Sequence, residues 1–197
     1  MKLQKNIVLP KPSMKGEMSL EEAILKRRSI RSFAPKELSI EEISQLLWAT
    51  QGITEKARGF RAAPSAGALY PLELYLIKSD GVFHYNVENH SLEKVGDKDV
   101  RGEIVQASLG QSFIQEAPVS IVICAVRSRV TSRYGSRGNR YVDIEVGHAA
   151  ENLHLQAVTL GLASVPIGAF TDSEAKRILG LPRDVEPIYI VPVGYAR

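Results

Sequence analysis

The apolar run Val119–Val126 (VSIVICAV) places the strongest constraint on how this chain can fold. The run is rich in β-branched residues and nearly continuous, which is typical of a strand that is buried at the centre of a sheet. It contains Cys124, the single cysteine of the chain, which we interpret as a small core residue. One cysteine can form neither an intrachain disulfide nor a cysteine metal cage.

The segments around this run predict a mixture of helices and antiparallel strands. Ser19 is a plausible helix N-cap, and Ser39 with Glu42 forms a capping box at the start of a second helix. Further elements are predicted as strands over Leu72–Ile77, Val82–Tyr85, Ala163–Ile167 and Ile188–Val193, and as helices over Val100–Ser108, Tyr141–Leu162 and Thr171–Gly180. This order predicts an α+β fold in which helices flank a central, mostly antiparallel sheet.

The chain has 197 residues, which is enough for one compact domain. Residues 1–18 contain two prolines and predict an extended N-terminal arm, and residues 19–197 predict the single domain. The long helix over Tyr141–Leu162 has small residues, which favour close packing on another helix at a dimer interface. We interpret Asp143, Glu145 and Glu151 on that helix as solvent-facing or interface charges.

Composition excludes several classes of protein. The net charge of +3 is too small to indicate a nucleic-acid partner. The sequence has no apolar run long enough to cross a membrane and no segment that resembles a signal peptide, so a cytoplasmic protein is expected.

The segment Arg127–Arg140 holds five arginines, and we predict that it forms a mobile surface loop. The alternative is a lid that attracts an anionic nicotinamide cofactor.

Three segments are candidates for binding chemistry. In Lys26–Arg31, alternating Arg27, Ser29 and Arg31 could converge on a phosphate, although the cluster could also complement the negative end of a helix. The small residues of Ala63–Pro71 would let the backbone approach a flat ligand. The amides of Gly168 and Ala169 could face a ligand heteroatom.

Other catalytic patterns are not found in the sequence. There is no Walker loop, no nucleophile elbow and no G-x-G-x-x-G after a strand, so a Rossmann domain is not expected. The four histidines lack the spacing of metal ligands, and we predict no metal site.

Five motifs in order resemble the nitroreductase-like flavoprotein superfamily. They are RRSIRSF (27–33), APSAGALYPLELYL (63–76), QEAPVSIVICA (115–125), GHAAENLHLQAVTLGLASVPIGAF (147–170) and YIVPVGYAR (189–197). The PSAGALYP form most resembles the SagB-type branch, which includes azoline dehydrogenases. The resemblance implies a nitroreductase-like fold and a homodimer that holds FMN at the subunit interface.

The resemblance also implies residue roles. Arg27, Arg28 and Ser29 would hold the FMN phosphate and ribityl chain, and Arg31 would reach the pyrimidine edge of the flavin. Pro64, Ser65, Ala66 and Leu69 would approach the same flavin from the other subunit, Pro166, Ile167, Gly168 and Ala169 would line the ring, and Arg197 would contact the phosphate. Many relatives carry Asn where this chain has Ala68, and many extend beyond the position of Arg197.

The activity implied is transfer of hydride from NADH or NADPH, through flavin N5, to nitroaromatic, quinone or related small acceptors in ping-pong turnover. The flavin would perform the chemistry, and no catalytic side chain is expected. The alternatives are a peptide thiazoline or oxazoline dehydrogenase, which runs the flavin oxidatively, and a flavin-binding module without turnover.

Overall fold

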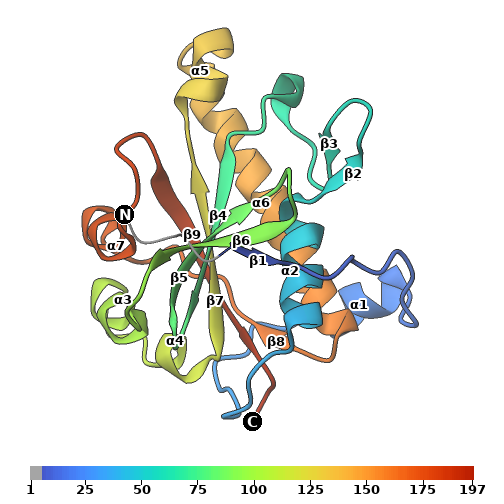
Figure 1. The fold of residues 1–197 in the computed structure, drawn as a ribbon, viewed down its shortest axis with the longest axis vertical. Coiled ribbons are helices and arrows are strands. Elements are labelled where there is room, and N and C mark those ends of the chain that lie inside the picture. Colours follow the sequence, from blue (N-terminus) through green and yellow to red (C-terminus); the bar gives the residue numbers. More distant parts are fainter. Residues whose placement is uncertain (1–5) are drawn as a thin grey trace.

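A seven-stranded sheet forms the centre of this computed structural model, which describes residues 6–197 (Figure 1). The strand order is β1-β6-β5-β4-β7-β9-β8. β7 (Val119–Ala125) pairs antiparallel with β4 (Leu72–Lys78) on one side and with β9 (Glu186–Gly194) on the other. All of its residues are buried, so the prediction of a central strand is confirmed. Residues 1–5 of the predicted arm lie outside the described part.

The other elements surround this centre. The remaining strands of the large sheet are β1 (Asn6–Val8), β5 (Gly81–Asn86), β6 (Ser91–Gly96) and β8 (Ala163–Ser164), and β2 (Ile53–Glu55) pairs with β3 (Phe60–Arg61) in a separate hairpin. The helices are α1 (Leu20–Lys26), α2 (Ile40–Gln51), α3 (Arg101–Ala107), α4 (Phe113–Glu116), α5 (Ser128–Tyr134), α6 (Arg137–Thr159) and α7 (Asp172–Leu179). A short 3₁₀ helix, η1, spans Ala66–Ala68. The α+β prediction is confirmed.

The two faces of the sheet are covered by different helices. Successive side chains of a strand point to opposite faces, and β4 divides in this way. Leu74 and Leu76 belong to a buried cluster that includes residues of α2 and α6. Tyr75 and Ile77 belong to a second cluster that includes residues of α3 and α7. Figure 1 shows the sheet between these two helical layers, with α2 and α6 on the side that carries α1.

Two helix starts follow from the capping residues. The Ser39 side chain accepts a hydrogen bond from the Glu42 amide, and the Glu42 carboxylate accepts one from the Ser39 amide. This capping box satisfies two amides that the first turn of α2 would otherwise leave unpaired. Ser19 caps α1 in the same way through the Glu22 amide, so both predicted N-caps are confirmed. Among residues 6–197, no helix combines the length and the apolar character needed to cross a membrane.

The N-terminal segment lies on α2 and on the edge of the sheet. β1 pairs antiparallel with β6, and neither of these two strands was predicted from the sequence. The Pro10 carbonyl accepts a hydrogen bond from Ser44 Oγ at 2.6 Å, and Gln45 Oε1 accepts one from the Ser13 amide at 2.7 Å. Ser44 and Gln45 are buried, so these contacts hold the segment against its own subunit.

Arg127–Arg140 is mostly helical, and the prediction of a mobile loop was wrong. α5 and the first turn of α6 occupy the segment, and Gly135 between them has φ of +58°. The Arg127 guanidinium pairs with Asp143 at 2.8 Å and with Glu186 at 2.9 Å. These ion pairs supply tertiary contacts that a pattern of apolar residues does not reveal. Arginine is also a good helix former, so the missing periodicity did not exclude a helix.

Two smaller boundaries also differ from the predictions. No helix or strand was predicted between residues 52 and 71, where the structure has the β2–β3 hairpin and η1. The strand expected over Ala163–Ile167 ends at Ser164, and Ile167 forms an isolated bridge with Ile190 of β9. Pro166 has no amide hydrogen to donate, which explains the interruption.

Candidate functional site

The segment after α1 is held in place by backbone hydrogen bonds to β8. The Ile30 amide donates to the Ser164 carbonyl at 3.1 Å, and Ser29 forms a parallel bridge with Ser164. Just beyond, Phe33 is fully buried and bridges Ala196. The segment is therefore extended and fixed at both ends, while Ser29 at one anchor and Arg31 between the anchors are exposed.

The arginines of this segment differ in what they contact. Arg27 is partly buried, and its Nε lies 3.8 Å from a carboxylate oxygen of Glu151 on α6. The Arg28 guanidinium donates to the carbonyls of Leu25 and Arg27, at the end of α1. Arg31 is exposed. The alternative interpretation, in which the cluster complements a helix terminus, therefore describes Arg28 but not the other two arginines.

His154 lies beneath the arginine segment. Its Nδ1 is 2.8 Å from Ser164 Oγ, while its Nε2 is buried without a hydrogen-bond partner among residues 6–197. Burial and, to a lesser extent, the positive charge of Arg27 lower the pKa of His154 to about 4. The neutral imidazole thus supports β8 at the point where β8 anchors Ile30. The sequence pattern around His154 predicted neither this burial nor this partner.

The segment from Pro166 to Ala169 continues from β8 along the edge of β9. Ile167 is buried and exchanges backbone hydrogen bonds with Ile190 at 2.8 and 3.0 Å. Gly168 and Ala169, which follow, are exposed. A Cβ atom at Gly168 would lie 3.6 Å from the Tyr189 ring, so the backbone here packs close to an aromatic side chain.

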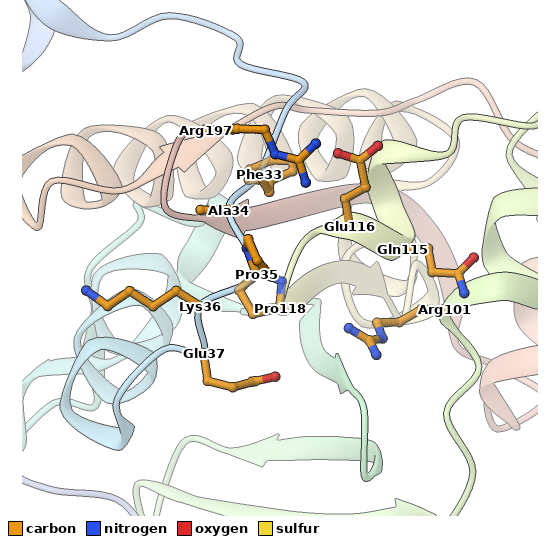
Figure 2. A pocket seen from close by; sticks show the side chains of 10 residues that line it. All are labelled: Phe33, Ala34, Pro35, Lys36, Glu37, Arg101, Gln115, Glu116, Pro118 and Arg197. Carbon is orange, nitrogen blue, oxygen red and sulfur yellow. The ribbon is translucent and has the colours of Figure 1, made fainter.

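The C-terminal residue reaches the same region. The Arg197 amide donates to the Ser32 carbonyl at 3.3 Å. Its side chain lines a cavity of about 340 Å³ together with Arg101, Glu37 and Glu116 (Figure 2). This cavity mixes both signs of charge, and of the described residues that were predicted to bind FMN it contains Arg197 alone. The Arg197 backbone therefore lies at the arginine segment, whereas its side chain borders a separate hollow.

The Pro64–Leu69 loop lies against α6 and α5. Ser65 Oγ donates to Glu145 Oε2 at 2.6 Å and accepts from the Tyr70 amide at 2.9 Å. Gly67 has φ of +62°, and a Cβ atom there would lie 2.7 Å from the Tyr134 hydroxyl. Only glycine fits this close approach at such a backbone angle.

Glu145 is buried, and its interpretation as a solvent-facing or interface charge was wrong. Its side chain is 2% exposed and its Oε1 has no hydrogen-bond partner among residues 6–197. Burial raises the pKa of Glu145 to about 7, against the opposing effects of Ser65 and Arg61. The spacing held a signal: Glu145 is three residues after Val142 and four before Ala149, which places it on the apolar face. Asp143 and Glu151 are exposed.

The structure therefore brings the predicted residues into two groups. The arginine segment, Pro166–Ala169 and Arg197 are joined by backbone contacts. The Pro64–Leu69 loop lies further along α6, at Glu145 rather than at Glu151 and His154. Six residues of helix separate the two glutamates, a rise of about 9 Å. Within one subunit the two groups line different parts of the surface.

The left-handed backbone at Ala68 gives a test of the loop. Ala68 has φ of +53°, which costs most L-residues about 1–2 kcal/mol, whereas Asn tolerates it better. We expect Ala68→Asn to raise the free energy of unfolding by about 0.5–1 kcal/mol, measured by urea denaturation. Ala66→Asn is the control, because Ala66 lacks the positive φ. An equal change in both variants would contradict this explanation.

A comparison with known families shows where this architecture belongs. The family model for the nitroreductase family matches residues 24–195 of this chain. The chain belongs to the nitroreductase family. A protein named as a nitroreductase in Methanocaldococcus jannaschii is 43% identical over 184 residues, which cover 90% of this chain and 91% of that protein.

More distant relatives include proteins with two different kinds of name. The microcin B17-processing protein McbC of Escherichia coli is 28% identical over 165 residues, covering 78% of this chain and 61% of that protein. An FMN reductase [NAD(P)H] of Bacillus subtilis is 25% identical over 182 residues, covering 85% of this chain and 62% of that protein. The chain thus spans less than two thirds of either relative.

Solved structures confirm the nitroreductase fold. A crystal structure of a protein described as a nitroreductase from Ralstonia eutropha superposes with a TM-score of 0.90 at 28% identity. The match covers 100% of this chain and 92% of that one. The resemblance on which the sequence analysis relied is therefore confirmed at the level of family and fold.

Proposed function

We propose that this member of the nitroreductase family is an FMN-dependent oxidoreductase that uses NADH or NADPH to reduce nitroaromatic, quinone or related small acceptors. The observation that carries the proposal is the arginine segment. Its extended backbone is fixed to β8 through Ile30 and to Ala196, beyond the end of β9, through Phe33, while Arg31 stays exposed. A preorganised group of guanidinium donors suits a phosphate-bearing cofactor.

The donor set fits FMN. Arg27, Arg28 and Ser29 would hold the phosphate and ribityl chain, and Arg31 would lie at the pyrimidine edge, where a positive charge stabilises the reduced ring. Arg197 would add a further contact to the phosphate. Pro166, Ile167, Gly168 and Ala169 would line one side of the ring, and Pro64, Ser65, Ala66 and Leu69 would line the other from the second subunit. The relative in Bacillus subtilis, named for FMN reduction, supports this choice of cofactor.

Bound FMN would supply the redox chemistry, taking up hydride from NAD(P)H and passing it to the acceptor in ping-pong order. The protein would bind both reactants in one place, orient them and exclude water. Exposed Gly168 and Ala169 leave room for a flat ligand to approach the backbone. No side chain of the site has to act as a nucleophile.

A homodimer would complete the site. The Pro64–Leu69 loop contacts α6 at Glu145, whereas the arginine segment lies near Glu151, further along the helix. A second copy of the chain could bring the loop of one subunit to the arginine segment of the other. Leu20, Ile24 and Leu25 of α1 are each more than half exposed, at 60%, 57% and 71%, and α1 packs on α6. Such a cluster of exposed apolar side chains is typical of an interaction surface.

A second candidate is a peptide-azoline dehydrogenase. The Pro64–Pro71 motif resembles that branch, and the relative McbC is named for the processing of microcin B17. This activity would use the same bound FMN in the oxidative direction, with oxygen as the acceptor. It differs from the first candidate in that NAD(P)H would not be needed to reduce the flavin.

The absorption spectrum of the purified protein separates these possibilities. We expect a flavin band that bleaches when NADH or NADPH is added without air, and recovers when a nitroaromatic or quinone acceptor follows. A flavin band that NAD(P)H leaves unchanged would favour the azoline dehydrogenase. A protein that remains colourless after incubation with FMN would overturn every flavin-based function.

A further inference from the structure

Glu145 and Ser65 form a buried hydrogen bond beneath the proposed cofactor loop. The Oε2–Oγ distance is 2.6 Å, and Ser65 Oγ also accepts from the Tyr70 amide at 2.9 Å. Glu145 is 2% exposed, whereas Ser65 is partly exposed. Ser65 therefore connects a buried carboxyl group with the surface on which the loop would meet a ligand.

The direction of this hydrogen bond depends on the proton of Glu145. An ionised carboxylate can only accept, so the Ser65 hydroxyl must donate to it and has no hydrogen left for another acceptor. A neutral carboxyl group can donate to Ser65 Oγ instead. The hydroxyl hydrogen of Ser65 is then free to point away from Glu145, toward the exposed side of the loop.

We propose that Glu145 is a positioning residue whose proton decides whether the Ser65 hydroxyl donates inward or to a ligand on the Pro64–Leu69 loop. The inference rests on the proposed function, because FMN is the ligand expected there. Glu145 acts through Ser65 and has no contact of its own with the ligand. The loop would then bind a ligand that carries a hydrogen-bond acceptor more tightly when Glu145 is neutral.

The surroundings of Glu145 favour the neutral form at moderate pH. Its Oε1 is buried without a donor among residues 6–197, which is costly for a charged oxygen. Burial is the largest influence and raises the pKa of Glu145 to about 7, whereas Ser65 and the positive charge of Arg61 on β3 lower it. Other charged or titratable groups near this part of the site include Tyr70, whose carbonyl accepts from Arg129 of α5, Arg133 and Tyr134 of α5 beside Gly67, and Tyr141 of α6, whose ring packs on Tyr134.

The proton can be observed without any cofactor. We expect infrared spectra of the apoprotein to show the carbonyl stretch of a protonated carboxyl group, which disappears as the pH rises through about 7. The difference between wild type and Glu145→Gln assigns the band, because the amide lacks it. If the two proteins show the same carboxyl titration between pH 5 and pH 9, Glu145 neither gains nor loses a proton in this range and the inference is wrong.

The effect on binding is tested by FMN titration of the apoprotein across the same pH range. Glu145→Gln has nearly the same shape and donates to Ser65 permanently, as the neutral acid would. We expect the wild type to match this variant near pH 5.5 and to bind FMN about three- to tenfold more weakly near pH 8.5, the effect of one hydrogen bond. The ratio of the two dissociation constants cancels the titration of the FMN phosphate.

Ser65→Ala shows whether the effect passes through the hydroxyl. In a Ser65→Ala background, Glu145→Gln should change FMN affinity by the same factor at every pH, because no hydroxyl remains to be redirected. If FMN binds but the ratio of the wild-type and Glu145→Gln dissociation constants stays constant with pH, this inference is wrong and the proposed function still stands. Failure of the wild type to bind FMN at any pH would overturn the proposed function, and the infrared experiment would still decide whether Glu145 holds the proton.

Discussion

Arg27→Ala is expected to weaken FMN binding by about one to two orders of magnitude. A hydrogen bond to a charged group contributes about 1.5–3 kcal/mol, and Arg27 is the one arginine of its segment that is partly buried and oriented by α6. Its ion pair with Glu151 is long and exposed, so the loss of that pair should cost little stability. The change should therefore appear in the dissociation constant for FMN rather than in folding.

Equilibrium titration of the apoprotein with FMN, followed by flavin fluorescence, measures this effect. Arg177→Ala is the matched control, because it removes the same charge from an exposed position on α7, which lies on the opposite side of the sheet from α1 (Figure 1). Arg28→Ala should have a smaller effect, since the Arg28 guanidinium already donates to two backbone carbonyls. An unchanged dissociation constant in Arg27→Ala would remove Arg27 from the cofactor site.

Glu145→Gln and His154→Asn are expected to change the pH dependence of stability by about 3 kcal/mol each, in opposite directions. The pKa of Glu145 rises from 4.5 to about 7, so in this range the folded protein holds a proton that the unfolded chain releases. Stability from this group therefore falls as the pH rises. The pKa of His154 falls from 6.5 to about 4, so the unfolded chain binds that proton first and stability is lost as the pH drops.

In the wild type, the effects of Glu145 and His154 on the free energy of unfolding oppose each other between about pH 4.5 and pH 6.5, where both groups contribute to its pH dependence. In Glu145→Gln only the effect of His154 remains, so stability should fall more steeply on acidification than in the wild type. His154→Asn keeps a polar group for Ser164. In that variant only the effect of Glu145 remains, so stability should rise on acidification relative to the wild type. Urea denaturation at pH 4 and pH 8 measures both effects, because this range spans the folded and unfolded pKa values of both groups. Difference curves against wild type that do not change with pH would refute the assignment of these protons.

The parts of the fold that the sequence predicted are those with strong local signals. The continuous β-branched run identified β7, and the reciprocal pairing of Ser39 and Glu42 identified the start of α2. The predicted strands Leu72–Ile77 and Val82–Tyr85 correspond to β4 and β5, which pair antiparallel in the structure. In each of these elements a short stretch of sequence contains the reason for its own conformation.

The missed features depend on residues that are distant in the sequence. β1 is a three-residue strand that exists because it pairs with β6, some 85 residues later, and neither strand has a clear apolar alternation. α5 is anchored by Arg129, whose guanidinium reaches the Tyr70 carbonyl and the Glu73 carboxylate. Such contacts leave no local pattern, so the segment was predicted as a loop.

The candidate site divides in the same way. The arginine segment and the Pro64–Leu69 loop were identified from motifs that each occupy a few consecutive residues. Glu145 and His154 were missed because a single glutamate or histidine on a helix is usually exposed. In this fold Glu145 contacts Ser65 of the Pro64–Leu69 loop and His154 contacts Ser164 of β8, and both are buried. Their helical spacing from Val142 and Ala150 was visible, but the partners Ser65 and Ser164 were not.

α6 contacts both groups of residues that form the proposed cofactor site, and a helix holds them at a fixed spacing. Glu145 lies under the Pro64–Leu69 loop, and Glu151 and His154 lie under the arginine segment and β8. Inserting or deleting one residue between positions 145 and 151 would rotate one half about 100° around the helix axis relative to the other. Related chains should therefore tolerate length changes in the connections around α6, whereas the count of residues along this stretch should be invariant.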